Sequence, residues 1–244
     1  MEGKRIVILG ATSGIGLAVA RLLVSMGWQV GVAGRNGQML EEVRAECPSQ
    51  ITTAEIDVTR ADASERLLHL IDAMGGMDVY FHSSGIGYQN LSLEAEKEED
   101  TLRTNGEGFV RMIGAAYRYF RAVGRGQIVA ITSVAATRGL GPAPAYSASK
   151  RFQMHYLQSI RQLAAIDRLP LVVTEIRPGF TDTPLLRSGH FPLLLSCPSV
   201  ARATVRAVIR RKRLLTIDWR YRILVSLWRM IPLRIWERIR LLGQ

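Results

Sequence analysis

Short apolar runs rich in β-branched residues recur along the chain and alternate with segments of helical length. Seven of these runs predict strands, at Arg5–Leu9, Gln29–Ala33, Ile51–Ile56, Val79–His82, Gln127–Thr132, Leu171–Ile176 and Leu214–Ile217. The runs lack strict alternation of polar and apolar residues, which is typical of a parallel sheet covered by helices on both faces. The pattern therefore predicts one α/β domain over residues 1–218, built on a doubly wound parallel sheet that binds ligands at the carboxyl ends of its strands.

The residues from Trp219 onward follow a different pattern. Apolar side chains recur at helical spacing on both sides of a break at Pro232: Ile223, Leu224, Leu227, Trp228 and Ile231, then Ile235, Trp236, Ile239 and Leu242. Arginines at 220, 222, 229, 234, 238 and 240 accompany this stripe. We therefore expect an amphipathic helical tail over residues 219–244.

Charge is concentrated in the same region. The 244-residue chain has a net charge of +11, and its last 44 residues carry 12 Lys and Arg side chains against two acidic ones. Tryptophan, aliphatic residues and arginine on amphipathic helices are typical of an anchor that lies at a membrane surface. A helix packed on its own domain or on a second subunit remains an alternative, as does a basic site that recruits an acidic carrier protein. A nucleic-acid partner is disfavoured, because the aromatic residues fall on the apolar stripe.

Composition indicates a folded protein of a reducing compartment. With 48% hydrophobic and 22% charged residues, the chain is not of a disordered class. Cys47 and Cys197 provide at most one disulfide. The sequence shows neither a secretion signal nor an apolar run long enough to span a bilayer, so we expect a cytoplasmic location with peripheral membrane contact through the tail. The four histidines show no metal-ligand spacing, and no metal site is predicted.

A glycine-rich turn follows the first predicted strand. It contains Gly10, Gly14 and Gly16, with Thr12, Ser13 and Ile15 between them, and it opens a helical pattern. The free N–H groups of a helix N-terminus favour a pyrophosphate, which side chains at the glycine positions would block. A plain glycine turn is the alternative, but its place in a βαβ unit favours dinucleotide binding.

Arg35 follows the second predicted strand, where an Asp or Glu would bind the adenine ribose of NAD. A guanidinium pairs with a 2′-phosphate, whereas a carboxylate would repel it. The sequence therefore predicts NADP in preference to NAD, with a solvated surface arginine as the alternative.

Three further residues predict acid–base chemistry. Tyr146 and Lys150 are four residues apart, a spacing that places them on one helix face, where an ammonium would lower the pKa of the phenol. Ser133 follows the fifth predicted strand and could hydrogen-bond a carbonyl oxygen that becomes negative. Taken alone, a Tyr and a Lys at this spacing are more often a surface pair.

These residues together, with Asn105, occur in the order and spacing of the short-chain dehydrogenase/reductase family, which the chain resembles over about residues 4–218. The resemblance implies a single-domain, Rossmann-like NAD(P)-dependent oxidoreductase with catalytic Asn105, Ser133, Tyr146 and Lys150. It implies that Asn105 lies in a distorted helix that positions a proton-relay water, and that Lys150 also binds the nicotinamide ribose. It further implies cofactor contacts at Asp57, Val58, Gly85, Tyr146, Pro178, Gly179, Thr181 and Thr183, and a homodimer or homotetramer.

Two parts of the sequence depart from the family pattern. Leu9 stands where the family has a threonine, and His82, Ser83 and Ser84 precede Gly85 where the family has Asn-Asn-Ala. The hydrogen bonds that join the centre of the sheet must then be made differently. We expect activity to survive, with cofactor affinity more affected.

The resulting hypothesis is hydride transfer between NADPH and a carbonyl or alcohol substrate. The segment Leu185–Ser196 contains Leu185, Leu186, Phe191, Leu193, Leu194 and Leu195, which would form an apolar lid over a lipid-like substrate or else pack on the domain. Alternatives are a 3-oxoacyl-carrier-protein-type reductase and a non-catalytic NADP-binding sensor. The complete set of Ser133, Tyr146 and Lys150 argues against a sensor, which needs no proton donor.

Overall fold

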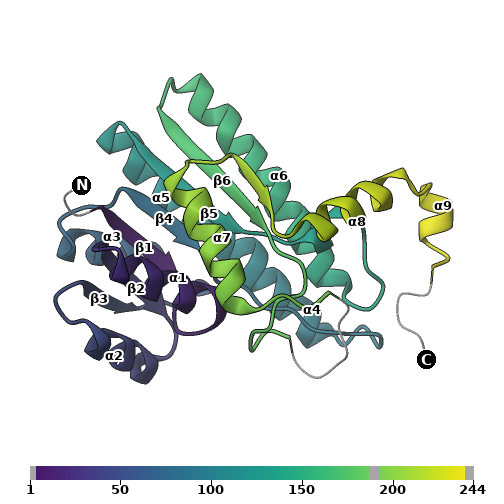
Figure 1. Ribbon diagram of the computed structural model, residues 1–244, viewed down its shortest axis with the longest axis horizontal. Coiled ribbons are helices and arrows are strands. Elements are labelled where there is room, and N and C mark those ends of the chain that lie inside the picture. The colour runs from purple at the N-terminus through teal and green to yellow at the C-terminus, as the bar shows by residue number, and fades with distance from the viewer. Residues whose placement is uncertain (1–3, 187–192, 240–244) are drawn as a thin grey trace.

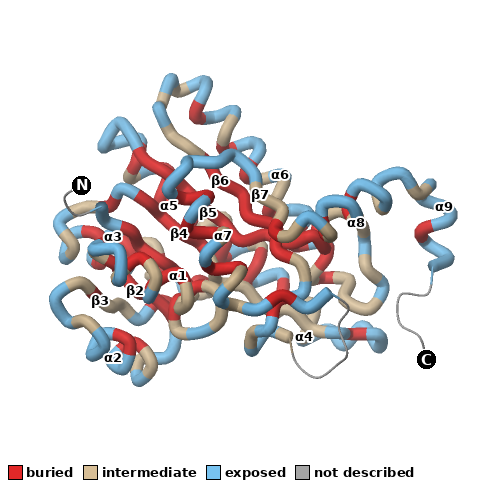
Figure 2. Tube along the Cα trace, in the orientation of Figure 1, coloured by how far each residue is buried: buried red, intermediate tan, exposed pale blue. Residues whose placement is uncertain are grey.

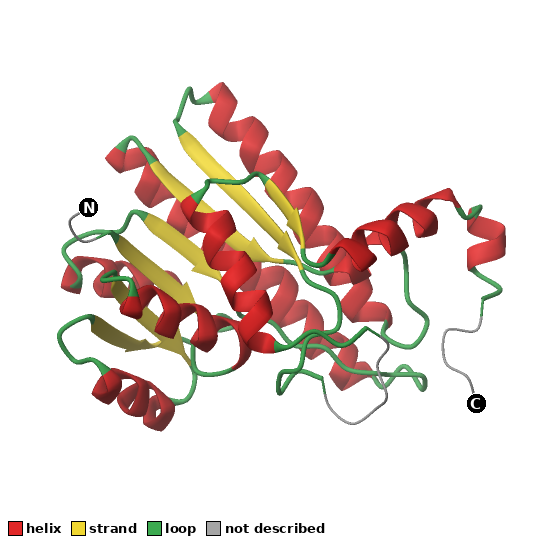
Figure 3. Cartoon of the chain, in the orientation of Figure 1, coloured by secondary structure: helices red, strands yellow, loops and turns green. Residues whose placement is uncertain are grey.

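A seven-stranded parallel sheet lies at the centre of the molecule, as the sequence predicts (Figures 1 and 3). The structure is a computed structural model that describes residues 4–186 and 193–239. The strands are β1 (Arg5–Leu9), β2 (Gln29–Gly34), β3 (Ile51–Glu55), β4 (Val79–His82), β5 (Gly126–Ile131), β6 (Leu171–Arg177) and β7 (Leu214–Thr216). Their order is β3-β2-β1-β4-β5-β6-β7, so β1 pairs with both β2 and β4.

Helices cover both faces of the sheet. One face carries α1 (Gly14–Ser25), α2 (Gly37–Glu46) and α7 (Cys197–Ile209), and the other carries α3 (Ala63–Ala73), α5 (Phe109–Val123) and α6 (Pro144–Ile166). Alternate residues of β1 enter opposite cores: Ile6 and Ile8 join the first, Val7 and Leu9 the second. All four are almost completely buried, which explains why the strand shows no polar alternation (Figure 2).

Between α4 (Ala95–Leu102) and α5 the helix widens into one π-helical segment, Arg103–Gly108. Asn105 lies in this segment and is fully buried. A π-turn shifts backbone carbonyls out of the ordinary i→i−4 ladder and is frequent at functional sites. The helix distortion at Asn105 that the family resemblance implies is therefore present.

The C-terminal segment forms two helices that extend beyond the body of the domain (Figure 1). Helix α8 spans Trp219–Met230, and α9 spans Leu233–Trp236, with the expected break at Pro232. Within residues 4–186 and 193–239, no helix combines the length and the apolar character needed to cross a bilayer. The division into a domain of residues 1–218 and a tail of residues 219–244 stays a prediction, as do the cytoplasmic location and the oligomer.

The packing of α1 on the preceding turn gives a testable expectation for Gly16. A Cβ at this position would lie 2.1 Å from the carbonyl oxygen of Gly10, a backbone atom that cannot rotate away. We expect Gly16→Ala to lower the free energy of unfolding by about 1–3 kcal/mol in urea titrations without cofactor. The control is Gly106→Ala, whose Cβ would meet nothing within 4 Å. Equal stability of the two variants would contradict the close approach.

Candidate active site

The predicted site residues come together at the carboxyl ends of the strands. Each group follows a different strand or lies on α6. Gly10, Thr12, Ser13, Gly14, Ile15 and Gly16 follow β1, Arg35 follows β2, Asp57 and Val58 follow β3, Gly85 follows β4, Ser133 follows β5, Tyr146 and Lys150 lie on α6, and Pro178, Gly179, Thr181 and Thr183 follow β6. Because parallel strands all end at one edge of the sheet, this order builds a continuous site.

Ser133, Tyr146 and Lys150 form one buried cluster. Ser133 precedes the short 3₁₀ helix Val134–Thr137, and its hydroxyl accepts a hydrogen bond from the amide of Ala135 at 3.1 Å. The Ser133 side chain is also hydrogen-bonded to Tyr146. The Nζ atom of Lys150 lies 5.8 Å from the centre of the Tyr146 ring. Tyr146 and Lys150 therefore lie on one face of α6, as their spacing predicts.

The ammonium of Lys150 is held by two oxygen acceptors. Nζ donates to the carbonyl of Ile131 at the end of β5, at 3.2 Å, and to Oε1 of Gln153 at 3.0 Å. Burial lowers the pKa of Lys150 to about 8. The side chain is thus poised to change charge near neutral pH rather than at the ordinary lysine value of about 10.4.

The pKa of Tyr146 moves opposite to the expected direction. Burial raises it, and the hydrogen bond with Ser133 opposes this only in part. The sequence expectation that Lys150 lowers this pKa is therefore wrong for this structure, because the helical spacing fixes which face the residues share but says nothing about how deeply the phenol is buried. Tyr146 is protonated at neutral pH and can serve as a proton donor.

The glycine-rich turn leaves the N-terminus of α1 open to an anion. Gly10 has a left-handed φ of 81°, and a Cβ there would lie 2.6 Å from the amide nitrogen of Ser84. Ser13 makes no side-chain capping bond, and the first turn of α1 has no acidic residue. A Cβ on Gly14 would lie 3.3 Å from Cγ2 of Thr183 and would occupy the space between the turn and that side chain. The turn therefore fits a dinucleotide pyrophosphate, with Thr183 beside it.

The adenine end of the site is less enclosed. Arg35 is exposed, and within the described part of the chain its side chain has no ion-pair or hydrogen-bond partner. Asp57 accepts bonds from the amide and the hydroxyl of Thr59, at 2.9 and 2.8 Å, which fixes its carboxylate at the end of the loop after β3. Val58 is buried, and its carbonyl accepts from Arg111 at 2.5 Å. An unpaired guanidinium at the end of β2 can receive a further anionic group.

Comparison with known proteins identifies the family. The family model described as short chain dehydrogenase matches residues 4–190. This chain belongs to the short chain dehydrogenase family. An uncharacterized oxidoreductase of Myxococcus xanthus is 28% identical over 240 residues, which are 95% of this chain and 94% of that protein. As a short chain dehydrogenase, the protein is an NAD(P)-dependent oxidoreductase.

Solved structures share the short chain dehydrogenase fold. An alcohol dehydrogenase of the archaeon Thermococcus sibiricus, complexed with 5-hydroxy-NADP, has a TM-score of 0.78 at 24% identity, covering 90% of this chain and 98% of that chain. A 3-ketoacyl-(acyl-carrier-protein) reductase of Brucella melitensis, complexed with NADH, has a TM-score of 0.81 at 21% identity, covering 89% and 97%. These likenesses confirm the α/β fold of the chain.

Gln153 is a site residue that the sequence reasoning missed. It is fully buried on α6; its Oε1 accepts from Lys150, and its Nε2 donates to the carbonyl of Asn105 at 2.9 Å. The Asn105 side chain in turn bonds both the amide and the carbonyl of Ile86, at 2.9 and 2.7 Å. The signal was present, since Gln153 lies three residues after Lys150, on the same helix face.

Gly87 was also missed. A Cβ at this position would lie 2.5 Å from Cδ2 of Tyr146. The absence of a side chain therefore lets the phenol ring lie against the backbone that follows β4. Gly85 has a related role, because its Cβ would lie 3.1 Å from Asn105 Oδ1 and 3.3 Å from Lys150 Nζ.

The residues that depart from the family pattern at the end of β4 make contacts of their own, although Nε2 of the buried His82 has no hydrogen-bond partner within the described residues. His82 is buried, its Nδ1 lies 2.9 Å from the Tyr80 hydroxyl, and its ring makes a T-shaped contact with the ring of Phe109 at a centroid distance of 4.9 Å. Burial lowers the pKa of His82 to about 3, so the ring is neutral. The Ser83 amide donates to the carbonyl of Leu9 at 2.8 Å, which continues the junction between β1 and β4.

The predicted lid is described in part. Leu185, Leu193 and Leu194 are exposed, whereas Leu195 packs in the core. Phe191 and the other residues of the range 187–192 lie outside the described residues. Packing on the domain is therefore shown for Leu195, whereas a lid role for the exposed leucines stays a prediction.

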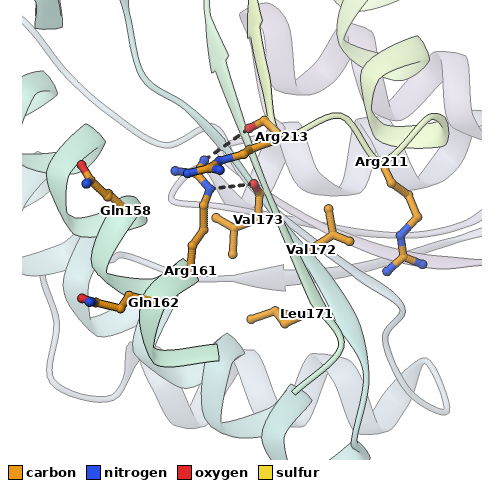
Figure 4. Close-up of a pocket in the computed structure, with 8 residues that line it drawn as sticks. All are labelled: Gln158, Arg161, Gln162, Leu171, Val172, Val173, Arg211 and Arg213. Atoms are coloured by element: carbon orange, nitrogen blue, oxygen red, sulfur yellow. Dashed lines mark hydrogen bonds between the residues drawn. The ribbon is translucent and has the colours of Figure 1, made fainter. Parts of the chain in front are cut away.

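An open hollow of about 600 Å³ lies between α6 and β6, away from the cluster of Ser133, Tyr146 and Lys150 (Figure 4). Arg161 reaches across it and donates to the carbonyls of Val173 at 3.1 Å and Arg213 at 3.3 Å. Its lining contains none of Ser133, Tyr146 and Lys150. Arg161 therefore ties α6 to the edge of the sheet.

The Lys150 network predicts a specific pH dependence. Above pH about 8 Lys150 loses its proton, so kcat/KM for carbonyl reduction should fall as pH rises through this value. Gln153→Leu removes an acceptor that favours the ammonium and should shift the fall to lower pH. Gln162→Leu, at an exposed position of the same helix, should leave the profile unchanged. Identical profiles for Gln153→Leu and the wild type would refute the role of Gln153.

Proposed function

We propose that the protein is an NADPH-dependent reductase of apolar carbonyl compounds. The observation that carries this proposal is the buried cluster of Ser133, Tyr146 and Lys150, in which the Lys150 ammonium lies 5.8 Å from the Tyr146 ring centre and is held by the Ile131 carbonyl and Oε1 of Gln153. Burial raises the pKa of Tyr146 and lowers the pKa of Lys150 to about 8, so the phenol keeps its proton at neutral pH. A protonated phenol is suited to donate to a carbonyl oxygen, which is the direction of reduction. The shared fold of the chain and of dehydrogenases with bound dinucleotides is consistent with this assignment.

The bound cofactor would supply a hydride to the carbonyl carbon of the substrate. The Ser133 hydroxyl would donate a hydrogen bond to the carbonyl oxygen, and Tyr146 would transfer its phenolic proton to that oxygen as negative charge develops. Lys150, charged below pH about 8, would stabilise the phenolate that remains. The Gln153 carboxamide would keep the ammonium in place during this step.

Several residues would hold the dinucleotide. The turn from Gly10 to Gly16 would bind the pyrophosphate, Asp57 and Val58 the adenine, and the segment from Pro178 to Thr183, with Gly85, the nicotinamide end. Arg35 supports NADP over NAD, because its exposed guanidinium is free to pair with a 2′-phosphate.

The substrate class follows from the exposed apolar residues near the site. Phe180, Leu185, Leu193 and Leu194 leave more than a third of their surface exposed, and all lie between β6 and α7. Such surface can enclose an apolar substrate when it closes over the nicotinamide end. A lipid-soluble ketone or aldehyde fits this surface better than a charged metabolite.

Tyr146→Phe tests the proton donor. The variant loses only the hydroxyl, so NADPH binding, followed by nicotinamide fluorescence, should be nearly unchanged. The rate of NADPH oxidation with apolar ketones and aldehydes should fall roughly 10²- to 10⁴-fold. Tyr156→Phe, on the same helix, should retain the wild-type rate. An unchanged rate in Tyr146→Phe would rule out Tyr146 as the proton donor. If the wild-type protein binds NADPH but turns over none of the substrates, the non-catalytic sensor is favoured.

Arg35→Asp tests the cofactor preference. Loss of a charge-assisted pair, together with repulsion of a 2′-phosphate, should raise the Kd for NADPH by roughly 10- to 100-fold. The Kd for NADH should stay the same or fall. Arg44→Asp on α2 changes the net charge equally and serves as the control. If the ratio of the two Kd values is the same in Arg35→Asp and Arg44→Asp, Arg35 does not select the cofactor.

A further inference from the structure

Helix α8 is apolar on two opposite faces. Tyr221 and Val225 are buried against the domain. Trp219, Ile223, Leu227 and Met230 leave 61%, 52%, 54% and 78% of their surface exposed. Because successive members of this set are three or four residues apart, which is about one helical turn, they form a single stripe on the side of α8 away from Tyr221. A helix that packs only on its own domain needs one apolar face.

The inner side of α8 is fixed to the segment between Ser133 and Tyr146. The Arg138 guanidinium donates to three carbonyls at the end of α8: Trp228 at 3.1 Å, Arg229 at 3.0 Å and Ile231 at 2.7 Å. The Trp236 indole donates to the carbonyl of Gly139 at 2.8 Å. These bonds cap α8 and hold α9 beside it, so the outer stripe has a defined orientation.

Tyr221 fixes α8 to the segment after β6 as well. Its hydroxyl accepts from the Phe180 amide at 3.1 Å and donates to the Leu193 carbonyl at 3.2 Å. A Cβ on Gly179 would lie 2.1 Å from the Tyr221 ring, so glycine permits this contact. Helix α8 therefore contacts both loops that flank the catalytic cluster.

The outer face comprises Trp219, Ile223, Leu227, Met230 and Leu233. Leu233 extends it onto α9 with 59% of its surface exposed. A shallow hollow of about 460 Å³ runs along it on α8. An exposed apolar patch of this kind, bordered by polar residues, marks an interaction surface.

Arginines border the outer face. Arg222 and Arg229 lie between the outer face and the buried side of α8, and Arg234 and Arg238 follow in the next segment. Arg220 pairs with Asp218 at 2.7 Å. In the range 4–186 and 193–239, the other four arginines have no acidic side chain within ion-pair distance. The border therefore carries uncompensated positive charge.

We infer that the outer face binds an anionic lipid surface. A row of tryptophan and aliphatic side chains with arginines at its edges matches the boundary between acyl chains and negatively charged headgroups. A second copy of the chain fits less well, because a symmetric contact would bring the same arginines together. The side chains of an acidic protein would pair with the arginines but would not account for the exposed apolar row between them.

Lipid binding here would hold the loops on both sides of the Ser133, Tyr146 and Lys150 cluster next to the bilayer. Arg138 and Tyr221 connect α8 to the loops on both sides of the catalytic cluster, and Leu193 lies at one of these contacts. A lipid-soluble substrate would then reach the site without crossing water. The delivery of substrate rests on the proposed function, whereas the binding of lipid does not.

The test is co-sedimentation of the full chain with phosphatidylcholine vesicles, with and without phosphatidylserine, in the absence of cofactor and substrate. We expect binding to phosphatidylserine vesicles that weakens as salt is raised. The double variant Ile223→Ser/Leu227→Ser should lose about tenfold in affinity for each residue. Arg222→Gln/Arg229→Gln should lose roughly fivefold for each residue and bind phosphatidylcholine as before.

The matched control is Met26→Ser/Leu68→Ser, which removes apolar side chains of similar exposure from α3 and the end of α1. It should bind vesicles like the wild type. Absence of binding to both kinds of vesicle, or equal loss in the two double serine variants, would overturn the inference. A dimer that Ile223→Ser/Leu227→Ser converts to a monomer without vesicles would assign the face to a second copy instead. NADPH titration of each variant is a separate readout, so failure of the lipid inference and failure of the proposed function are distinguishable.

Discussion

Burial of the Lys150 ammonium is the constraint on which the arrangement of the active site depends. A buried charge is tolerated only when acceptors replace water. The Ile131 carbonyl at the end of β5 and Oε1 of Gln153 are two such acceptors. Gln153 is fixed in turn by the Asn105 carbonyl, which the π-helical segment presents. The strand end, the helix distortion and one face of α6 are therefore joined through a single positive charge.

The position of the C-terminal segment extends this arrangement outward. Arg138 lies between Ser133 and Tyr146 in sequence and caps α8, while Tyr221 of α8 bonds both ends of the segment that begins after β6. The loops around the catalytic cluster and the C-terminal helices are thus one connected structure. A surface bound on the outer face of α8 would hold these loops without touching the reacting groups.

The sequence predicted the fold well, because its signal is local. Runs such as Val79–His82 and Gln127–Thr132 are apolar enough to mark strands buried on both faces, and the glycine turn marks the first crossover. The clustering of Ser133, Tyr146 and Lys150 was predictable from their order and spacing together with the family resemblance, not from the Tyr146 and Lys150 spacing alone. Periodicity places residues on a face but gives no depth, so the direction of the Tyr146 pKa was wrong and the bridging role of Gln153 was missed.

The same limit applies to the tail. The apolar stripe predicted from the sequence grouped two sets of α8 residues together. Leu224 and Trp228 are partly buried toward the domain, whereas Ile223 and Leu227 are exposed and face outward. The burial of Tyr221 and the contacts of Arg138 show which face meets the domain, and both depend on residues far away in the sequence. Long-range contacts of this kind leave no pattern in a single sequence.

The most direct test of the buried ammonium is a titration of Lys150 itself by NMR. The chain has four lysines, Lys4, Lys97, Lys150 and Lys212, so isotope-labelled lysine side chains give few signals, and Lys150→Met identifies the relevant one. We expect this resonance to titrate near pH 8 in the cofactor-free protein. A Lys150 resonance that titrates at the ordinary lysine value of about 10.4 would contradict the buried ammonium and the chemistry built on it.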